Sequence, residues 1–259
     1  MLAERFDAFL FDLDGVLYRG DEPVPGAADV VAALRRLGKG IAFVTNNSAR
    51  TPQAVSAKLM AVGIDASPEE VETSALTTAA LLAARHVRDA YVVGGEGVRR
   101  ALGEAGVVVL EGDPPTAGAV VVGFDPEVDY AKLRRASLLV GAGVPFIATN
   151  PDASFPATDG ERWPGAGAIA AAIETTTGVR AEVIGKPNAP ILAAALARAG
   201  GGRPLMIGDR LDTDIAGAVT MGWSSFLVLT GISTRADVRA FPFAPTYVWE
   251  DLSLLTDPA

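Results

Sequence analysis

Short apolar runs alternate along the chain with segments in which apolar residues recur at helical spacing. Residues 8–11 form an unbroken apolar run, which is typical of a strand buried on both faces of a parallel sheet. Residues 41–44 form a second such run, and the segment between the two has helical periodicity up to Gly38. Strands that alternate with helices pair in parallel through right-handed crossovers. The pattern therefore predicts an α/β fold.

The same alternation continues to the end of the chain. We expect further strands at residues 91–93, 107–110, 119–122, 145–148, 183–184, 204–207, 226–229 and 247–248. We expect further helices at residues 52–62, 74–85, 96–104, 130–142, 168–177, 191–199 and 212–221. Residues 67–70 fit a capping box, and residues 149–167, rich in Pro, Asp and Gly, are predicted to be a loop. A new unit begins near Tyr91, and the closing part returns to the first pattern.

Length, charge and composition narrow the class of protein. The 259 residues favour two domains, and 49% hydrophobic residues suffice for substantial cores. A net charge of −9 argues against a nucleic-acid partner, which needs a basic face. The absence of cysteine excludes disulfides, thiolate nucleophiles and cysteine-based zinc sites. No run of about 18 apolar residues occurs and the first residues are charged, so we expect a cytoplasmic protein with no membrane partner.

Polar clusters follow four of the apolar runs. They are Asp12 with Asp14, Thr45 with Asn46, Lys186, and Asp209 with Asp214. At the carboxyl edge of one parallel sheet such clusters would converge, and this edge is where open α/β folds bind ligands. Asp12 and Asp14 lie two residues apart, so on an extended chain they point to the same side and repel each other unless a cation or a proton intervenes. Each cluster alone also fits a helix cap, a solvated loop lysine or a helix start.

Other sequence features do not indicate a different chemistry. Gly95-Glu96-Gly97 lacks the third glycine of a dinucleotide loop, and Gly185-Lys186 is followed by proline where a P-loop needs Ser or Thr. There is no Gly-x-Ser-x-Gly elbow for a hydrolase triad. His86, the only histidine, stands among arginines at a predicted helix end, and we expect it to be a solvated surface residue.

The ordered set of clusters resembles the haloacid dehalogenase (HAD) superfamily of phosphohydrolases. Asp12-Leu13-Asp14-Gly15 matches its first motif, Thr45 its second, Lys186 its third, and Gly208-Asp209 with Asp214 its fourth. The segments around the last three motifs look like subclass IIA, the NagD-like and p-nitrophenylphosphatase-like members. They are residues 44–48, 185–187 and 208–215.

The resemblance implies a role for each matching residue. Asp12 would be the nucleophile that forms an aspartyl phosphate, and Asp14 the general acid and base. Thr45 and Asn46 would donate hydrogen bonds to the substrate's phosphoryl oxygens, and Asn47 would also bind the substrate. Lys186 would offset the charge of nucleophile and phosphate.

The resemblance also implies a Mg²⁺ cofactor. Asp12, the backbone carbonyl of Asp14 and Asp209 would hold this ion, because magnesium prefers oxygen ligands. Asp214 would hold it through water or orient its ligands.

The implied architecture is a Rossmann-like parallel-sheet HAD core with an inserted α/β cap of the C2 type. The core would span residues 1–80 and 181–259, and the cap residues 81–180. Asn150, Asp152 and the loop through Phe155 match the cap segment that faces the site, so Asn150 and Asp152 would bind the substrate, although a Pro-Asp turn explains them equally well. Related proteins also suggest a homodimer through the cap.

Three functions remain open at this stage. The first is a phosphatase of small phosphorylated metabolites, with phosphoglycolate-, glycerol phosphate-, sugar phosphate- or nucleotide-like monoesters as substrates. The second is a phosphotransferase or mutase that uses the same aspartyl phosphate. The third is a non-catalytic phosphate-binding module.

Overall fold

The computed structural model describes residues 1–156 and 161–256, and the chain forms two compact units. Unit 1 comprises Met1–Thr45, Pro52–Glu72 and Lys186–Ala259. Unit 2 comprises Asn46–Thr51 and Thr73–Gly185. The second unit thus begins before residue 81, ends after residue 180 and takes in a short segment from the first half of the chain. These bounds differ from the expected ones because contacts, rather than continuity of the sequence, decide which unit a linking residue joins.

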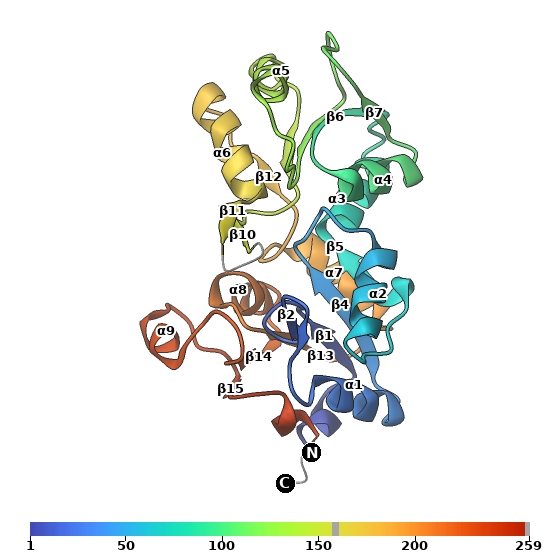
Figure 1. Ribbon diagram of the computed structural model, residues 1–259, viewed down its shortest axis with the longest axis vertical. Coiled ribbons are helices and arrows are strands. Elements are labelled where there is room, and N and C mark those ends of the chain that lie inside the picture. The colour runs from blue at the N-terminus through green and yellow to red at the C-terminus, as the bar shows by residue number, and fades with distance from the viewer. Residues whose placement is uncertain (157–160, 257–259) are drawn as a thin grey trace. The chain divides into compact units, whose positions relative to one another are not determined.

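Unit 1 is built on a parallel sheet with the strand order β15-β14-β13-β1-β4-β5 (Figure 1). Its strands are β1 (Ala8–Phe11), β4 (Gly40–Thr45), β5 (Val71–Thr73), β13 (Pro204–Gly208), β14 (Ser224–Val228) and β15 (Tyr247–Trp249). Its helices are α1 (Ala27–Arg36), α2 (Pro52–Ala61), α7 (Ala189–Arg198), α8 (Ala216–Thr220) and α9 (Arg235–Ala240). A small hairpin of β2 (Tyr18–Arg19) and β3 (Glu22–Pro23) follows β1.

The central strand β1 shows why the sheet needs a continuous apolar run. Phe9 and Phe11 pack on one face of the sheet with residues of α1 and α2, whereas Ala8 and Leu10 pack on the other face with residues of α7. All four residues are fully buried. The strand pairs in parallel with β13 on one side and β4 on the other, so the chain that leaves β1 emerges at the middle of the sheet's carboxyl edge.

Unit 2 is a second parallel sheet with the strand order β12-β9-β8-β6-β7. Its strands are β6 (Asp89–Val93), β7 (Val108–Leu110), β8 (Val120–Val122), β9 (Phe146–Ala148) and β12 (Glu182–Val183). Its helices are α3 (Ser74–Ala84), α4 (Glu96–Glu104), α5 (Tyr130–Gly141) and α6 (Ala166–Thr177). Val92 packs with α3 and α4, and Tyr91 and Val93 pack with α5 and α6, so helices cover both faces.

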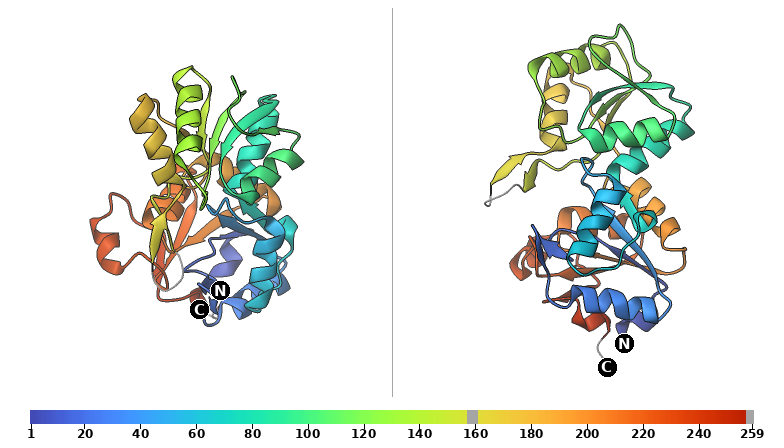
Figure 2. Two further views of the ribbon diagram at one scale, coloured as in Figure 1. Left: turned by 45° about the horizontal axis from the view of Figure 1, so that its top comes forward. Right: turned by 45° about the vertical axis from the view of Figure 1, so that its right-hand side comes forward.

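Several elements depart from the predicted pattern. The expected loop before α6 contains an antiparallel hairpin, β10 (Ser154–Pro156) and β11 (Arg162–Pro164), which extends away from the sheet of unit 2 in Figure 2. The expected helix at residues 212–221 begins as one π-helical turn, Leu211–Ile215, before α8. The short elements β5 and α9 were not predicted, because three to six residues are too few to show a period.

One difference bears directly on the site. Strand β12 pairs with β9 and therefore belongs to the sheet of unit 2. Lys186 consequently does not follow a strand of the unit 1 sheet, and it lies three residues before α7. The expectation that all four polar clusters follow strands of one sheet is wrong for this lysine.

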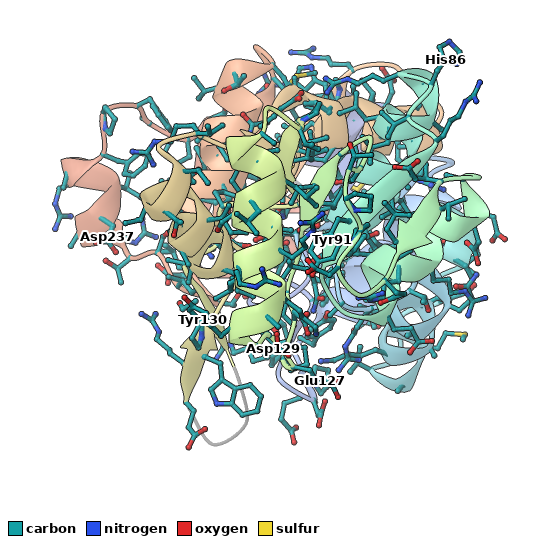
Figure 3. All side chains as sticks on the ribbon, turned by 90° about the horizontal axis from the view of Figure 1, so that it is seen from above. His86, Tyr91, Glu127, Asp129, Tyr130 and Asp237 are labelled. Atoms are coloured by element: carbon teal, nitrogen blue, oxygen red, sulfur yellow. The ribbon has the colours of Figure 1, made fainter. Side chains whose placement is uncertain are left out.

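Two further sequence expectations can be compared with the structure. His86 is exposed at the end of α3, where Figure 3 shows it at the rim of the molecule, so the prediction of a surface histidine is confirmed. None of the helices in the described part of the chain has the length and apolar composition needed to cross a bilayer.

Candidate active site

The end of β1 places the first two carboxylates. Asp12 is still held by the sheet, because its backbone N–H donates to the Ile207 carbonyl at 2.8 Å. The chain then turns at Gly15, which has a φ of +83° and whose N–H donates to the Tyr18 carbonyl at 2.8 Å. A Cβ at this position would come within 2.5 Å of Asp209 Oδ2. Glycine is therefore required here both by the backbone conformation and by the closeness of Asp209.

Lys186 is the buried cation of the site. Its Nζ lies 2.5 Å from Asp12 Oδ1 and 2.7 Å from Asp214 Oδ1, and it donates to the Val44 carbonyl at 3.2 Å. The side chain is only 2% exposed. Burial alone would lower the pKa of Lys186, but attraction to the two carboxylates outweighs burial and raises it. The ammonium group is therefore charged at neutral pH.

Asp12, Asp209 and Asp214 form a cluster of carboxylates, with one oxygen of each within 4.8 Å of the others. Asp209 Oδ2 accepts a hydrogen bond from the Ile232 N–H at 2.7 Å, whereas its buried Oδ1 accepts none from the described residues. Burial, followed by repulsion from Asp12 and Asp214, raises the pKa of Asp209 to about 8. Burial likewise raises the pKa of Asp214, although Lys186 opposes this.

These groups fit a divalent cation. When all three carboxylates are ionised, they and the one ammonium group leave a local charge of −2, and buried like charges are stable only when a cation or a proton compensates them. Asp209 Oδ1 offers a hard oxygen donor without a competing hydrogen bond. Oxygen donors of this kind are those that Mg²⁺ prefers.

Asp14 is exposed, whereas Asp12 is only partly accessible and Asp209 and Asp214 are buried. The Asp14 carboxyl group is nevertheless surrounded closely enough for burial to raise its pKa, while the charge of Lys58 acts in the opposite direction. Lys58 lies on α2, and its Nζ sits 4.1 Å from the centre of the Tyr18 ring. An accessible carboxyl with a raised pKa is suited to exchange protons with a bound molecule.

Sequence reasoning missed the segment that supports Asp209. Thr230 Oγ1 donates to the Gly15 carbonyl at 2.5 Å, and the Ser233 N–H donates to the Asp209 carbonyl at 3.0 Å. A Cβ at Gly231 would collide with the Asp209 carboxyl group. The segment follows β14 at the same edge of the sheet. The signal was present in the sequence, because Thr-Gly after an apolar run is one more polar cluster behind a strand.

The remaining predicted residues divide between the units. Thr45 ends β4 in unit 1 and is 7% exposed, whereas Asn46 and Asn47 begin a segment of unit 2. Asn47 Oδ1 accepts from the Ala49 N–H at 2.9 Å. Asn150 is buried, and its Nδ2 donates to the Asn46 carbonyl at 2.7 Å.

The structure thus forms two groups from the predicted site residues. The first, in unit 1, joins Asp12, Lys186, Asp209 and Asp214. The second, in unit 2, joins Asn46 with Asn150, and the half-buried Asp152 donates its N–H to Asn150 Oδ1 at 3.1 Å.

Comparison with known proteins agrees with this geometry. Residues 9–108 match the family model of haloacid dehalogenase-like hydrolases, and residues 183–255 match a second HAD-hydrolase-like model. The chain is 39% identical over 254 residues to an acid sugar phosphatase of Staphylococcus epidermidis, which covers 97% of both chains. It is 40% identical over 253 residues to the acid sugar phosphatase of Staphylococcus aureus, which covers 96% of both.

Solved structures show the same relationship. A thermostable NPPase from Geobacillus stearothermophilus matches with a TM-score of 0.86 and 37% identity, over 95% of this chain and 96% of that one. A glycerol phosphate phosphatase from Mycobacterium tuberculosis in complex with magnesium matches with a TM-score of 0.92 and 36% identity, over 98% of this chain and 77% of that one. The chain therefore belongs to the haloacid dehalogenase-like hydrolases, and within them it is a phosphatase of the NagD-like and p-nitrophenylphosphatase-like subclass.

Proposed function

We propose that this phosphatase is Mg²⁺-dependent and hydrolyses small phosphorylated metabolites through an aspartyl phosphate on Asp12. The observation that carries the proposal is the buried Lys186, which bridges Asp12 and Asp214. Asp209 belongs to the same carboxylate cluster, and its Oδ1 accepts no hydrogen bond from the described residues. This set of charges suits a phosphate dianion and a divalent cation together, because phosphoryl transfer depends chiefly on positioning and charge stabilisation.

Two steps transfer the phosphoryl group. In the first, a carboxylate oxygen of Asp12 attacks phosphorus, the bond from phosphorus to the ester oxygen breaks, and Asp14 donates its proton to that oxygen. In the second, Asp14 takes a proton from water as the water oxygen attacks phosphorus. The bond to the Asp12 carboxylate then breaks, which releases inorganic phosphate and restores both side chains. The accessible carboxyl of Asp14, with its raised pKa, suits this exchange of a proton.

The other residues bind and orient the phosphoryl group. Lys186 would attract its oxygens while holding the Asp12 carboxylate in place, and Thr45, Asn46 and Asn47 would donate hydrogen bonds to them. Asp12, Asp209, Asp214 and the Asp14 carbonyl would hold Mg²⁺, which when bound supplies positive charge to the phosphoryl oxygens.

The substrate class follows from the relatives. Their names include acid sugar phosphatase and glycerol phosphate phosphatase, so sugar phosphates and glycerol phosphate are the first candidates. The first test measures phosphate release from these esters, phosphoglycolate, a nucleoside monophosphate and p-nitrophenyl phosphate, with Mg²⁺ and no other acceptor. Release of free phosphate supports a hydrolase, whereas turnover only after addition of a second metabolite identifies a phosphotransferase or mutase.

The variant Asp12→Asn tests the covalent step. It keeps the shape of the side chain but removes the attacking charge, so we expect turnover to fall by more than a thousandfold while the fold is retained. Asp29→Asn is a matched control, because Asp29 is exposed on α1 and carries the same charge. Turnover of Asp12→Asn within tenfold of wild type would refute the mechanism, since tenfold corresponds to only about 1.4 kcal/mol.

A further inference from the structure

The main chain passes between the two units at four places. At three of these places, a unit 2 residue at or next to the passage is Asn46 itself or lies in contact with it. The passages lie at residues 45–46, 51–52, 72–73 and 185–186. Ser74, at the start of α3, donates its Oγ to the Asn46 carbonyl at 2.6 Å. Gly185 lies so close that a Cβ there would come within 2.6 Å of Asn46 Oδ1. Segments far apart in the sequence therefore converge on one residue.

Asn150 completes this arrangement from a distance of 104 residues along the chain. Its Nδ2 donates to the same Asn46 carbonyl at 2.7 Å, and its Oδ1 accepts the Asp152 N–H at 3.1 Å. The side chains concerned are almost inaccessible, since Asn46 is 8% exposed, Asn150 4% and Ser74 0%. Both ends of the Asn150 amide are thus engaged within unit 2.

These contacts give the Asn46 carbonyl two buried donors, the Ser74 hydroxyl and the Asn150 amide. Removing a donor from a buried carbonyl carries a cost, so both donors restrict the main chain at Asn46. Gly185 packs closely against the Asn46 side chain, since a Cβ at this position would come within 2.6 Å of Asn46 Oδ1. The main chain of Asn46 is therefore fixed by side chains that have no proposed contact with the phosphoryl group.

We infer that Asn150 is a positioning residue, which together with Ser74 fixes Asn46 in the orientation that binds the phosphoryl group. The inference rests on the role proposed for Asn46. It gives Asn150, which was expected in the cap segment that faces the site, a supporting role behind Asn46. Because Asn46 acts on the phosphoryl group, which every substrate carries, loss of Asn150 affects all substrates equally.

The experiment is a double-mutant cycle of Asn46→Ala and Asn150→Ala. kcat and KM are measured for glycerol phosphate, glucose 6-phosphate and p-nitrophenyl phosphate. Asn150→Ala alone lowers kcat/KM by roughly tenfold to a hundredfold, by one factor for all three esters, since small misplacements of binding groups have effects of this size. On the Asn46→Ala background the same change lowers kcat/KM by less than about threefold, because the group that it positions is already absent.

Two controls accompany the cycle. Ser74→Ala removes the other donor and shows the same uniform and non-additive pattern. Thr78→Ala removes a buried hydroxyl of α3 that donates to the Ser74 carbonyl at 2.7 Å and does not touch Asn46, so its kcat/KM stays within about twofold of wild type. If Asn150→Ala does not fold, as judged by circular dichroism, the Ser74→Ala cycle provides the test.

Two results would overturn the inference. Factors for Asn150→Ala that differ more than about tenfold among the three esters would show that it contacts the leaving group. Full multiplication of the two single effects in the double variant would show that it acts independently of Asn46. Failure of the proposed function looks different, because the wild-type protein would then release no phosphate or Asp12→Asn would remain active.

Discussion

Replacing Lys186 with methionine tests whether its ammonium group balances the carboxylates of the site. The side chain is 2% exposed and lies 2.5 Å from Asp12 Oδ1 and 2.7 Å from Asp214 Oδ1. Methionine has a similar length and no charge, so the change removes the cation with little loss of volume. Among the ion pairs of the described residues, Lys186 supplies the only ammonium group of this cluster. The variant therefore leaves the three carboxylates without it.

The size of the effect follows from these distances. At an effective dielectric constant of about 20, each of the two contacts contributes roughly 6 kcal/mol of attraction, and desolvation offsets several kcal/mol for each ion. Removing one partner of a buried ion pair typically costs about 3–5 kcal/mol, because the remaining charge stays buried. In a protein of this size 1 kcal/mol corresponds to about 2–4 °C, so we expect Tm to fall by about 10 °C.

The assay compares Tm in chelator and in Mg²⁺. We expect the full loss in chelator and partial recovery in Mg²⁺, because a bound ion at a hundred times its Kd stabilises the folded state by about 2.7 kcal/mol. Lys39→Met is the control for net charge, since Lys39 Nζ makes a partly buried hydrogen bond to the Phe6 carbonyl at 2.7 Å, which is worth about 1 kcal/mol. A Lys186→Met protein as stable as wild type in chelator would refute the charge balance described here.

Three further predictions follow from the same geometry. Chelation should abolish phosphate release and Mg²⁺ should restore it, with Ca²⁺ restoring less because it takes more and longer oxygen contacts; full activity in excess chelator would contradict the role of Asp209. Gly231→Ala should lower kcat/KM at least tenfold, because a Cβ there overlaps the Asp209 carboxyl, whereas Gly103→Ala on α4 has open space and should behave as wild type. Burial opposes ionisation of Glu70, but hydrogen bonds from Arg35 and the Ser67 amide outweigh burial and lower the pKa of Glu70. The ionised Glu70 therefore stabilises the fold above about pH 4.3, and this stabilisation is lost as the pH falls further. Urea unfolding of Arg35→Ala should therefore show a loss of about 1 kcal/mol at pH 7 that shrinks below pH 4, and a loss independent of pH would count against this pairing.

The first motif illustrates what a sequence predicts well. An apolar run that ends in carboxylates two residues apart constrains the strand, the edge of the sheet and the direction of the side chains at once, because all three follow from the period of an extended chain. The structure has the predicted strand at Ala8–Phe11, and it brings Asp12 together with Lys186, Asp209 and Asp214. The pKa of Asp209 is raised first by burial and then by repulsion from Asp12 and Asp214, so the close carboxylates here come from separate motifs and not from the Asp12 and Asp14 pair.

The misplaced strand before Lys186 illustrates what a sequence does not contain. The apolar residues Val183 and Ile184 would suit a strand of either sheet, and the sequence of so short a strand does not indicate which strand it pairs with. Its pairing with β9 is decided by tertiary packing, which also brings Lys186 to Asp12 across 174 residues. The support of Asp209 by residues 230–233 is likewise non-local, since its glycine is explained only by the carboxyl group that lies against it.

The motif at Thr45 shows how a continuous sequence signal can be divided in space. Thr45 and Asn46 are neighbours in the chain and resemble one phosphate-binding loop, yet Thr45 ends a strand of unit 1 and the Asn46 carbonyl is held by Ser74 and Asn150 of unit 2. A motif indicates which residues act together on a ligand, whereas contacts show which residues pack together. If Asn46 binds the phosphoryl group as proposed, unit 2 supplies part of the chemistry common to all substrates and is not confined to selecting among them. Substrate preference would then be sought in residues that do not hold the Asn46 carbonyl. Asp152 donates its backbone N–H, and not its carboxyl group, to Asn150 Oδ1, so it is the residue of the predicted set to vary first.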